Sequence, residues 1–166
     1  FLDDTLKTPE DIEQRLKLAV LGIIPKLTKQ SPEEASRDLR SAFSESYRSV
    51  RTALQFSTDH GVPRVLLITS AGPGEGKSTT SLTLARNFAQ MGKRVLLIEG
   101  DLRNPSLHRT LELSPEAGLS NVLAGGMLLA DAVRATDDER LSVMLAGPLP
   151  PNPAELLSGP KLVSLL

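Results

Sequence analysis

The chain has 166 residues, of which 40% are hydrophobic, and it carries a formal net charge of −1 at pH 7. This length suits one domain with a sizeable core, and the nearly balanced charge argues against wholesale nucleic-acid binding. The sequence contains no cysteine, which excludes a disulfide framework and a thiolate metal site, and no apolar run is long enough to cross a bilayer. We therefore expect a soluble globular chain.

The N-terminal part of the chain predicts a helix, a short strand and a linker. Thr8 is a candidate N-cap and Pro9 suits the first helical position, so a helix is expected from there to about Leu18. The apolar residues 20–24 predict a short buried strand, and residues 28–32 predict a polar linker. Nothing catalytic is visible in this part.

Residues 33–56 predict one long helix with two different faces. Its apolar stripe contains Leu39, Phe43, Val50 and Leu54, and the opposite face carries Arg37, Arg40, Arg48 and Arg51. A solvated face is the ordinary interpretation of such a charge run. A docking surface for an acidic partner or an anionic membrane is the alternative, and the residues alone leave both open.

Residues 65–80 combine an apolar strand, a glycine-rich turn and the start of a helix, which is the pattern of a phosphate-binding loop. Glycines keep side chains out of the loop, so that backbone N–H groups can surround phosphate oxygens. Lys77 supplies a charge to the terminal phosphates, and the Ser78 hydroxyl is a candidate Mg²⁺ ligand at the positive end of the helix dipole. Ala71 replaces the first glycine of the strict pattern, a change that a small residue allows. The predicted nucleotide-binding residues are Gly72, Gly74, Glu75, Gly76, Lys77, Ser78 and Thr79.

The helix after this loop is expected to run from Lys77 to about Met91 and to end at Gly92. The apolar residues 95–98 then predict a second strand, and the lack of alternation indicates burial on both faces of a parallel sheet. Together with the strand at 65–68 they would form a right-handed βαβ unit.

Three charged residues follow the second strand, and they share one side if the strand geometry continues. In an open α/β sheet, ligands gather at the carboxyl ends of the strands, where these side chains would face the glycine-rich loop. Two carboxylates there could hold Mg²⁺ and accept a proton from an attacking hydroxyl, whereas an exposed acidic loop is the alternative. The predicted catalytic residues are Lys77, Glu99, Asp101 and Arg103, and the predicted metal ligands are Ser78, Glu99 and Asp101.

The remaining residues complete an α/β pattern. Short helices are predicted at 118–123 and 128–134, a third strand at 141–146, and a helix from Ala154. The proline-rich loop at 147–153 is equally consistent with a nucleotide contact and with a rigid connector. We expect an α/β fold with a mostly parallel sheet flanked by helices.

The whole chain resembles the kinase domain of the bacterial tyrosine kinases (BY-kinases), within the MinD and ParA group of P-loop NTPases. Five segments carry this resemblance. Residues 1–11 resemble the segment after the family's second membrane helix, and Glu45-x-x-Arg48-x-x-Arg51 resembles the family's oligomerisation motif. Ala71 to Thr79 resembles the family's Walker A motif, Glu99-x-Asp101-x-Arg103 resembles its Walker A′ pattern D-x-D-x-R, and residues 151–157 resemble a recurrent loop of the family.

This resemblance implies an ATP-dependent protein-tyrosine autokinase, with Mg²⁺, that regulates capsular or exopolysaccharide synthesis and export. Asp101 would help to activate the tyrosine hydroxyl, and Arg103 would orient the acids. Glu45, Arg48 and Arg51 would join subunits into a ring, in which each subunit presents a tyrosine-rich tail to the next. The implied partner is the membrane region of a polysaccharide co-polymerase, fused or separate, at the cytoplasmic face of the bacterial inner membrane, with no nucleic acid.

The resemblance also divides the chain into a juxtamembrane segment, residues 1–32, and a P-loop kinase domain, residues 33–166, that ends before the family's Walker B strand. We therefore expect a fragment of a longer protein. Glu99 replaces the first Walker A′ aspartate, so a nucleotide-binding assembly module with weak catalysis stays open as a second function. A MinD/ParA-like ATPase switch is a third, although Gly72 stands where those ATPases carry a signature lysine.

Overall fold

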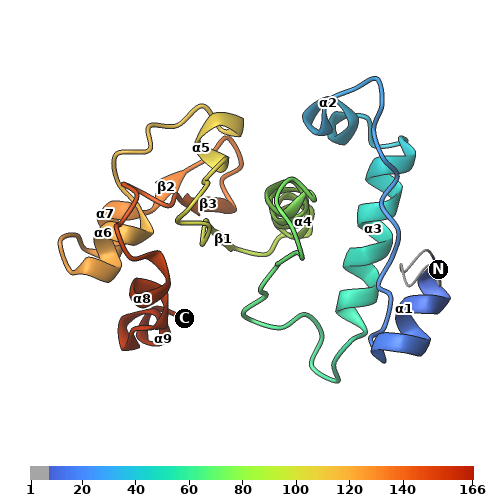
Figure 1. The fold of residues 1–166 in the computed structure, drawn as a ribbon. Helices are drawn as coiled ribbons and strands as arrows, with labels where there is room; N and C mark the ends of the chain where they lie inside the picture. The colour runs from blue at the N-terminus through green and yellow to red at the C-terminus, as the bar shows by residue number, and fades with distance from the viewer. Residues whose placement is uncertain (1–7) are drawn as a thin grey trace. The chain divides into compact units, whose positions relative to one another are not determined.

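The computed structural model describes residues 8–166, and the chain forms two compact units, residues 1–64 and 65–166 (Figure 1). Of the segment matched at residues 1–11, the first seven residues lie outside the described part, and the division at residue 32 stays a prediction. In residues 8–166, no helix has the length and apolar character needed to cross a membrane.

The first unit begins with helix α1, Pro9–Leu16. The Thr8 hydroxyl accepts the Asp11 N–H at 3.2 Å and the Asp11 carboxylate accepts the Thr8 N–H at 3.1 Å, so the predicted helix start is confirmed. The predicted strand at 20–24 is wrong, since the segment has no strand geometry and Ile23 is 67% exposed. An extended segment becomes a strand only when another strand pairs with it, and the described part of this unit contains none.

The predicted single helix over 33–56 is two helices, α2 (Pro32–Arg37) and α3 (Ala42–Gln55). Asp38 leaves the helical conformation, and its side chain accepts the Arg40 N–H at 2.9 Å. Ser41 then starts α3 as its N-cap and accepts the Ser44 N–H at 3.1 Å. Short polar side chains that bond the backbone locally therefore interrupt the helix.

Helix α3 buries the apolar face that the sequence predicts, with one replacement. Phe43 and Leu54 are buried, whereas Leu39 lies in the break before α3 and is 61% exposed. Tyr47, which the predicted stripe omits, is 2% exposed and packs edge-on against the Phe43 ring with the centroids 4.9 Å apart.

The second unit is built on a three-stranded sheet in the order β1-β3-β2. β1 (Val95–Ile98) runs parallel to β3 (Leu141–Met144), which confirms both predicted strands. β2 (Arg134–Ala135) pairs antiparallel with β3, so the sheet is mixed. Arg134, the first residue of β2, is the last residue of the predicted helix 128–134, which is reduced to α7, Leu129–Ala132.

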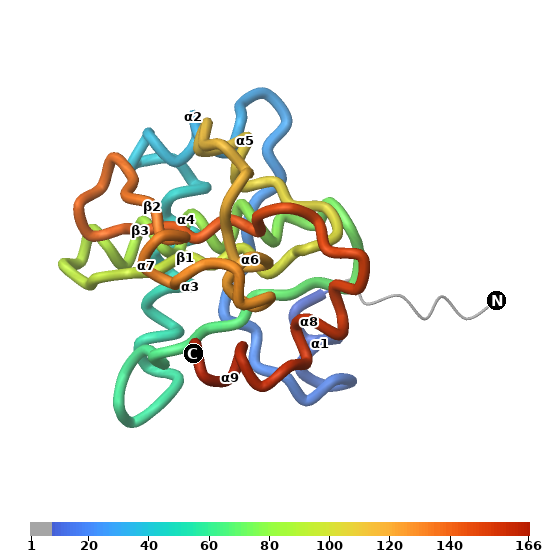
Figure 2. Tube along the Cα trace, turned by 90° about the vertical axis from the view of Figure 1, so that its left-hand side faces the viewer, coloured from blue at the N-terminus to red at the C-terminus, as the bar shows by residue number. Residues whose placement is uncertain are grey.

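Helices cover both faces of this sheet (Figure 1). Leu141, Val143 and Leu145 pack with α4 (Lys77–Gln90) and α5 (Leu107–Thr110) in one buried cluster. Met144 and Ala146 point the other way, into a cluster with α6 (Leu119–Ala124) and α7. Apolar side chains of α8 (Pro153–Ser158) and α9 (Pro160–Leu165), at the red end of the trace in Figure 2, pack against that second cluster. The predicted α/β architecture is confirmed, as are the helices from Lys77, near 118 and near 154.

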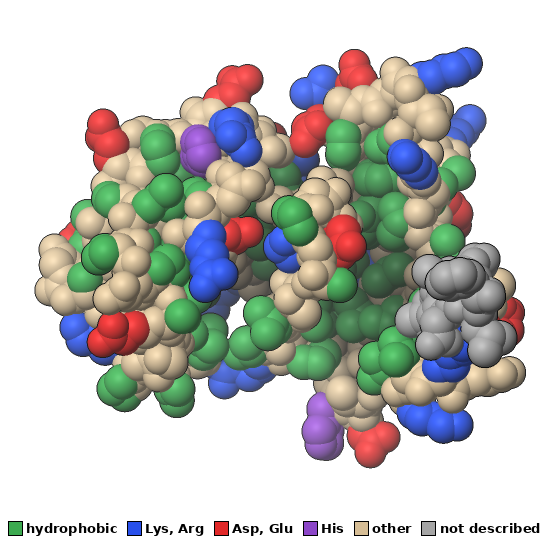
Figure 3. Space-filling model, viewed as in Figure 1, with side chains coloured by type: hydrophobic (Ala, Val, Ile, Leu, Met, Phe, Trp, Pro, Cys, Tyr) green, Lys and Arg blue, Asp and Glu red, His purple; other side chains and the backbone are tan. Residues whose placement is uncertain are grey.

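The predicted strand before the glycine-rich loop is wrong in this structure. Residues 66–70 have no assigned secondary structure, and Leu67 is 86% exposed. No other strand among residues 8–166 pairs with them, so the predicted βαβ unit is not formed. β1 is also not buried on both faces, because Leu96 is 41% exposed. Apolar side chains reach other parts of the surface as well, as the green atoms of Figure 3 show.

Candidate functional site

The loop before α4 has the backbone geometry of an anion site. Gly74 and Gly76 adopt the left-handed conformation, with φ of 74° and 86°, and no atom lies within 4 Å of the place where a Cβ would stand on either. Gly76 is the N-cap of α4, and no side chain caps this end of the helix. The N–H groups of the first turn thus face an open loop at the positive end of a 14-residue helix. A nucleotide phosphate fits this loop.

The Glu75 carboxylate accepts a hydrogen bond from one backbone N–H group of the same loop. The Glu75 side chain folds back, and its Oε2 accepts the Gly72 N–H at 3.0 Å. The Ser70 hydroxyl donates to the Gly72 carbonyl oxygen at 2.7 Å and fixes the start of the same turn. The loop therefore presents an N–H group to a carboxylate oxygen, as it would to an oxygen of a phosphate.

The predicted phosphate and metal ligands occupy the first turn of α4. Lys77, Ser78 and Thr79 are all half-buried. The Ser78 Oγ accepts a hydrogen bond of 2.7 Å from the Ser106 Oγ, which comes from a loop 28 residues further along the chain. Sequence reasoning missed Ser106, because an isolated serine carries no motif.

The Glu99 carboxylate is buried at the end of β1, where it is 5% exposed. Its Oε1 accepts the N–H groups of Ser106, at 2.5 Å, and of Leu107, at 2.8 Å. Its Oε2 accepts the Ala146 N–H at 3.2 Å, just beyond the end of β3. One carboxylate thus joins the ends of two strands to the loop that reaches Ser78.

The other two residues of this motif lie closer to the surface. β1 ends at Ile98, so the strand alternation expected for Glu99, Asp101 and Arg103 does not continue. Asp101 is half-buried, and its Oδ1 accepts the N–H groups of Arg103 at 3.2 Å and of Asn104 at 2.9 Å. Arg103 is exposed. The roles of these side chains stay predictions.

A set of donors that suits Mg²⁺ is present only in part. Residues 8–166 contain no group of three or more His, Cys, Asp or Glu side chains placed to hold a metal ion. Mg²⁺ in nucleotide sites is held by one or two protein oxygens together with phosphate oxygens and water. The Ser78 hydroxyl, at the edge of the anion loop, fits that requirement.

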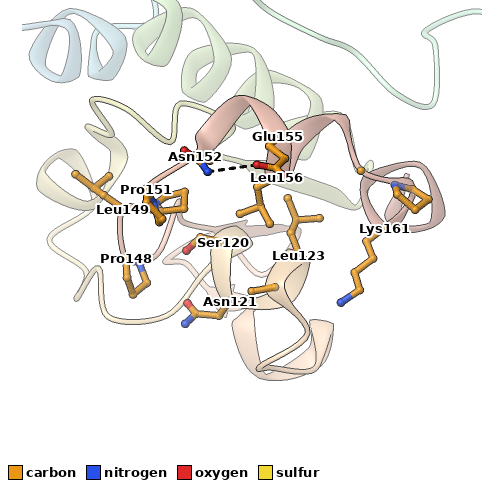
Figure 4. A pocket seen from close by; sticks show the side chains of 14 residues that line it. Ser120, Asn121, Leu123, Pro148, Leu149, Pro151, Asn152, Glu155, Leu156 and Lys161 are labelled. Carbon is orange, nitrogen blue, oxygen red and sulfur yellow. Dashed lines mark hydrogen bonds between the residues drawn. The ribbon is translucent and has the colours of Figure 1, made fainter.

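A separate hollow of about 630 Å³ lies on the α6 side of the sheet (Figure 4). Ser120 and Asn121 of α6, the prolines of the loop after β3, and Lys161 of α9 line it. Asn152 donates to the Glu155 carboxylate at 3.3 Å across its rim. No residue of the predicted nucleotide site belongs to this lining, so the proline-rich loop shapes a different hollow.

In the first unit, the predicted oligomerisation residues lie on α3. Glu45 and Arg48 form an ion pair one turn apart, with the Glu45 side chain 69% exposed. The Arg51 Nε is buried and has no hydrogen-bond partner among the described residues. Their role in assembly stays a prediction.

Comparisons with known proteins agree on one family. The model of the CobQ/CobB/MinD/ParA nucleotide binding domain matches residues 66–145. The tyrosine-protein kinase YwqD of Bacillus subtilis is 47% identical over 124 residues, which is 75% of this chain and 52% of YwqD. The solved BceF tyrosine kinase domain is 34% identical with a TM-score of 0.82, over 96% of this chain and 70% of that one. The kinase domain of Escherichia coli tyrosine kinase ETK is 32% identical with a TM-score of 0.82, over 95% of this chain and 66% of that one. The chain spans about half the length of YwqD.

Proposed function

Because the chain belongs to the bacterial tyrosine-protein kinases, within the CobQ/CobB/MinD/ParA nucleotide-binding family, we propose that it binds ATP with Mg²⁺ and transfers the γ-phosphoryl group to tyrosine. One observation carries this proposal. The glycine loop opens at the start of α4, next to a Ser78 hydroxyl that a hydrogen bond joins to the loop after β1. The phosphate loop is therefore in direct contact with the loop that follows β1 and carries the acid motif.

The mechanism assigns a separate task to each side chain. The loop amides and the Lys77 ammonium bind and orient the β- and γ-phosphates, and Ser78 offers its oxygen to the metal. Bound Mg²⁺ would supply positive charge that offsets the charge developing on the phosphate oxygens. Asp101 accepts the proton of the attacking tyrosine hydroxyl, and Arg103 orients the acidic loop. These roles rest on motif position and on family.

A second candidate is a nucleotide-binding assembly module with weak catalysis, and one observation favours it. Glu99 stands at the first acidic position of the motif, and both of its oxygens already accept backbone N–H groups. A MinD/ParA-like ATPase switch is the remaining alternative, supported by the family model alone.

The partners and the location follow from the same family. Glu45, Arg48 and Arg51 would join copies into a ring, in which one subunit phosphorylates the tyrosine-rich tail of its neighbour. The membrane region of a polysaccharide co-polymerase would hold the ring at the cytoplasmic face of the inner membrane. Capsular or exopolysaccharide synthesis and export would be the regulated process.

Phosphotyrosine formation with ATP and Mg²⁺ tests the proposal in the natural protein that carries this chain. We expect labelling with the native Glu99 that Lys77→Met abolishes. Phosphate release without phosphotyrosine would support the ATPase switch. Labelling by Glu99→Asp alone would support the assembly module.

A further inference from the structure

We propose that Ser106 is a positioning residue for the Ser78 hydroxyl, and that Glu99 holds the backbone of Ser106 in place for this task. The inference rests on the proposed nucleotide site and goes beyond it, because neither Ser106 nor this role for Glu99 belongs to the motifs described above. Its physical content is a chain of hydrogen bonds from Ala146 through Glu99 and Ser106 to Ser78.

The Ser106 hydroxyl does not make the bond that a serine at its position ordinarily makes. Ser106 is the N-cap of α5, where a serine hydroxyl usually accepts an N–H of the first turn. Here it makes no cap hydrogen bond, and its Oγ donates instead to the Ser78 Oγ at 2.7 Å. The hydroxyl is therefore directed out of its own helix and toward α4.

Glu99 fixes the backbone from which this hydroxyl projects. The Glu99 Oε1 accepts the N–H of Ser106 itself and the N–H of Leu107, the first residue of α5. The other oxygen of the carboxylate accepts the Ala146 N–H, which fixes the carboxylate against the end of β3. These bonds hold the backbone of Ser106 in place, so its hydroxyl stays within reach of Ser78.

The bond from Ser106 orients the Ser78 hydroxyl. A hydroxyl has one donor hydrogen and two acceptor lone pairs. The Ser106 donor takes one lone pair, which leaves the other for a metal ion and the hydrogen for a phosphate oxygen. The same bond selects one of the staggered side-chain conformations of Ser78 before the metal arrives. Ser106 therefore lowers the ordering cost of metal binding without touching the metal.

The test measures nucleotide affinity rather than turnover. Titration calorimetry gives the dissociation constant of ATP for the natural protein with Mg²⁺ and again with EDTA. Because a neutral hydrogen bond contributes only modestly to the net free energy, we expect Ser106→Ala to raise the dissociation constant of ATP measured with Mg²⁺ about five-fold. The constant measured in EDTA should not change, since the loop amides and Lys77 hold the phosphates. Ser106→Thr retains the hydroxyl and should restore the Mg²⁺-dependent affinity.

Ser81→Ala is the matched control. The Ser81 hydroxyl lies one turn along α4 and donates to the Lys77 carbonyl oxygen at 2.8 Å, so its loss tests a serine that bonds only its own helix. This variant should leave both constants unchanged.

Three results would overturn the inference. Ser106→Ala could leave the Mg²⁺-dependent constant unchanged, or it could weaken both constants equally, which would indicate a structural role alone. Failure of Ser106→Thr to restore the affinity would also count against positioning by the hydroxyl. A parent protein that binds no ATP under either condition would overturn the proposed function as well, so the two failures are distinguishable.

Discussion

Replacing Glu99 by glutamine tests whether this carboxylate holds the site together. The structure gives it three donors, the N–H groups of Ser106, Leu107 and Ala146. Glutamine retains one oxygen, which can serve the first two donors, and turns an NH₂ group toward the third. Three charge-assisted bonds therefore become two neutral ones, and the Ala146 N–H loses its acceptor.

The magnitude follows from the values of the two kinds of bond. At about 2 kcal/mol for each charge-assisted bond and about 1 kcal/mol for each neutral one, the gross loss is about 4 kcal/mol. Glutamine also avoids the desolvation cost of a buried carboxylate, which is several kcal/mol and offsets part of that loss. We expect the free energy of unfolding of the second unit to fall by roughly 1–2 kcal/mol.

Urea unfolding followed by circular dichroism measures this change through the midpoint at constant slope. Glu116→Gln is the matched control, because Glu116 is exposed, and such a surface substitution should stay within about 0.5 kcal/mol of the parent. A Glu99→Gln protein as stable as this control would refute the reasoning, since the three donors would then need no charged acceptor.

Three further outcomes are expected at other positions. Gly76→Ala should lower the free energy of unfolding by about 1–2 kcal/mol, because φ is 86° at this position. It should also weaken ATP binding measured by calorimetry, and an unchanged affinity would show that the loop does not hold the phosphates. Glu75→Gln should raise ATP affinity a few-fold at low salt, since the carboxylate that accepts the Gly72 N–H repels phosphate; equal affinity for parent and variant would contradict this. Arg48→Ala should reduce oligomer size in analytical ultracentrifugation and change the unfolding free energy by less than about 1 kcal/mol, because its pair with Glu45 is exposed on the Glu45 side; an unchanged oligomer would exclude Arg48 from the interface.

The sequence predicts the local structure around α4 correctly, but it does not predict which apolar segments find a pairing partner. The helix at 77–90 and the left-handed Gly92 follow from residues within a few positions of each other. The strands predicted at 20–24 and 65–68 failed because apolar composition indicates that a segment could be a strand, while pairing depends on a partner from elsewhere in the chain. The break before α3 is different, because its signal is local. The prediction of one helix over 33–56 takes no account of Ser41, whose side chain caps a new helix.

In the candidate site too, residues that are adjacent in sequence could be predicted, and contacts between distant residues could not. The phosphate loop could be predicted because its glycines, Lys77 and Ser78 are adjacent in sequence. The Ser106 contact could not, because it joins two residues of an unremarkable type across 28 positions. Glu99 lies between these cases, since the sequence marks it as a site residue but does not show what its oxygens bind.

The hydrogen bonds that the Glu99 and Asp101 carboxylates already accept indicate different roles for these two acids. A carboxylate offers about four acceptor positions, and Glu99 uses three of them for the N–H groups of Ser106, Leu107 and Ala146 while being only 5% exposed. Asp101 accepts two backbone N–H groups through Oδ1 and is half-buried. We therefore expect proton acceptance from a tyrosine hydroxyl to fall to Asp101, and the shape of the site to fall to Glu99. On this view a glutamate is suited to the position, because its longer side chain lets one carboxylate reach the start of α5 and the end of β3 together.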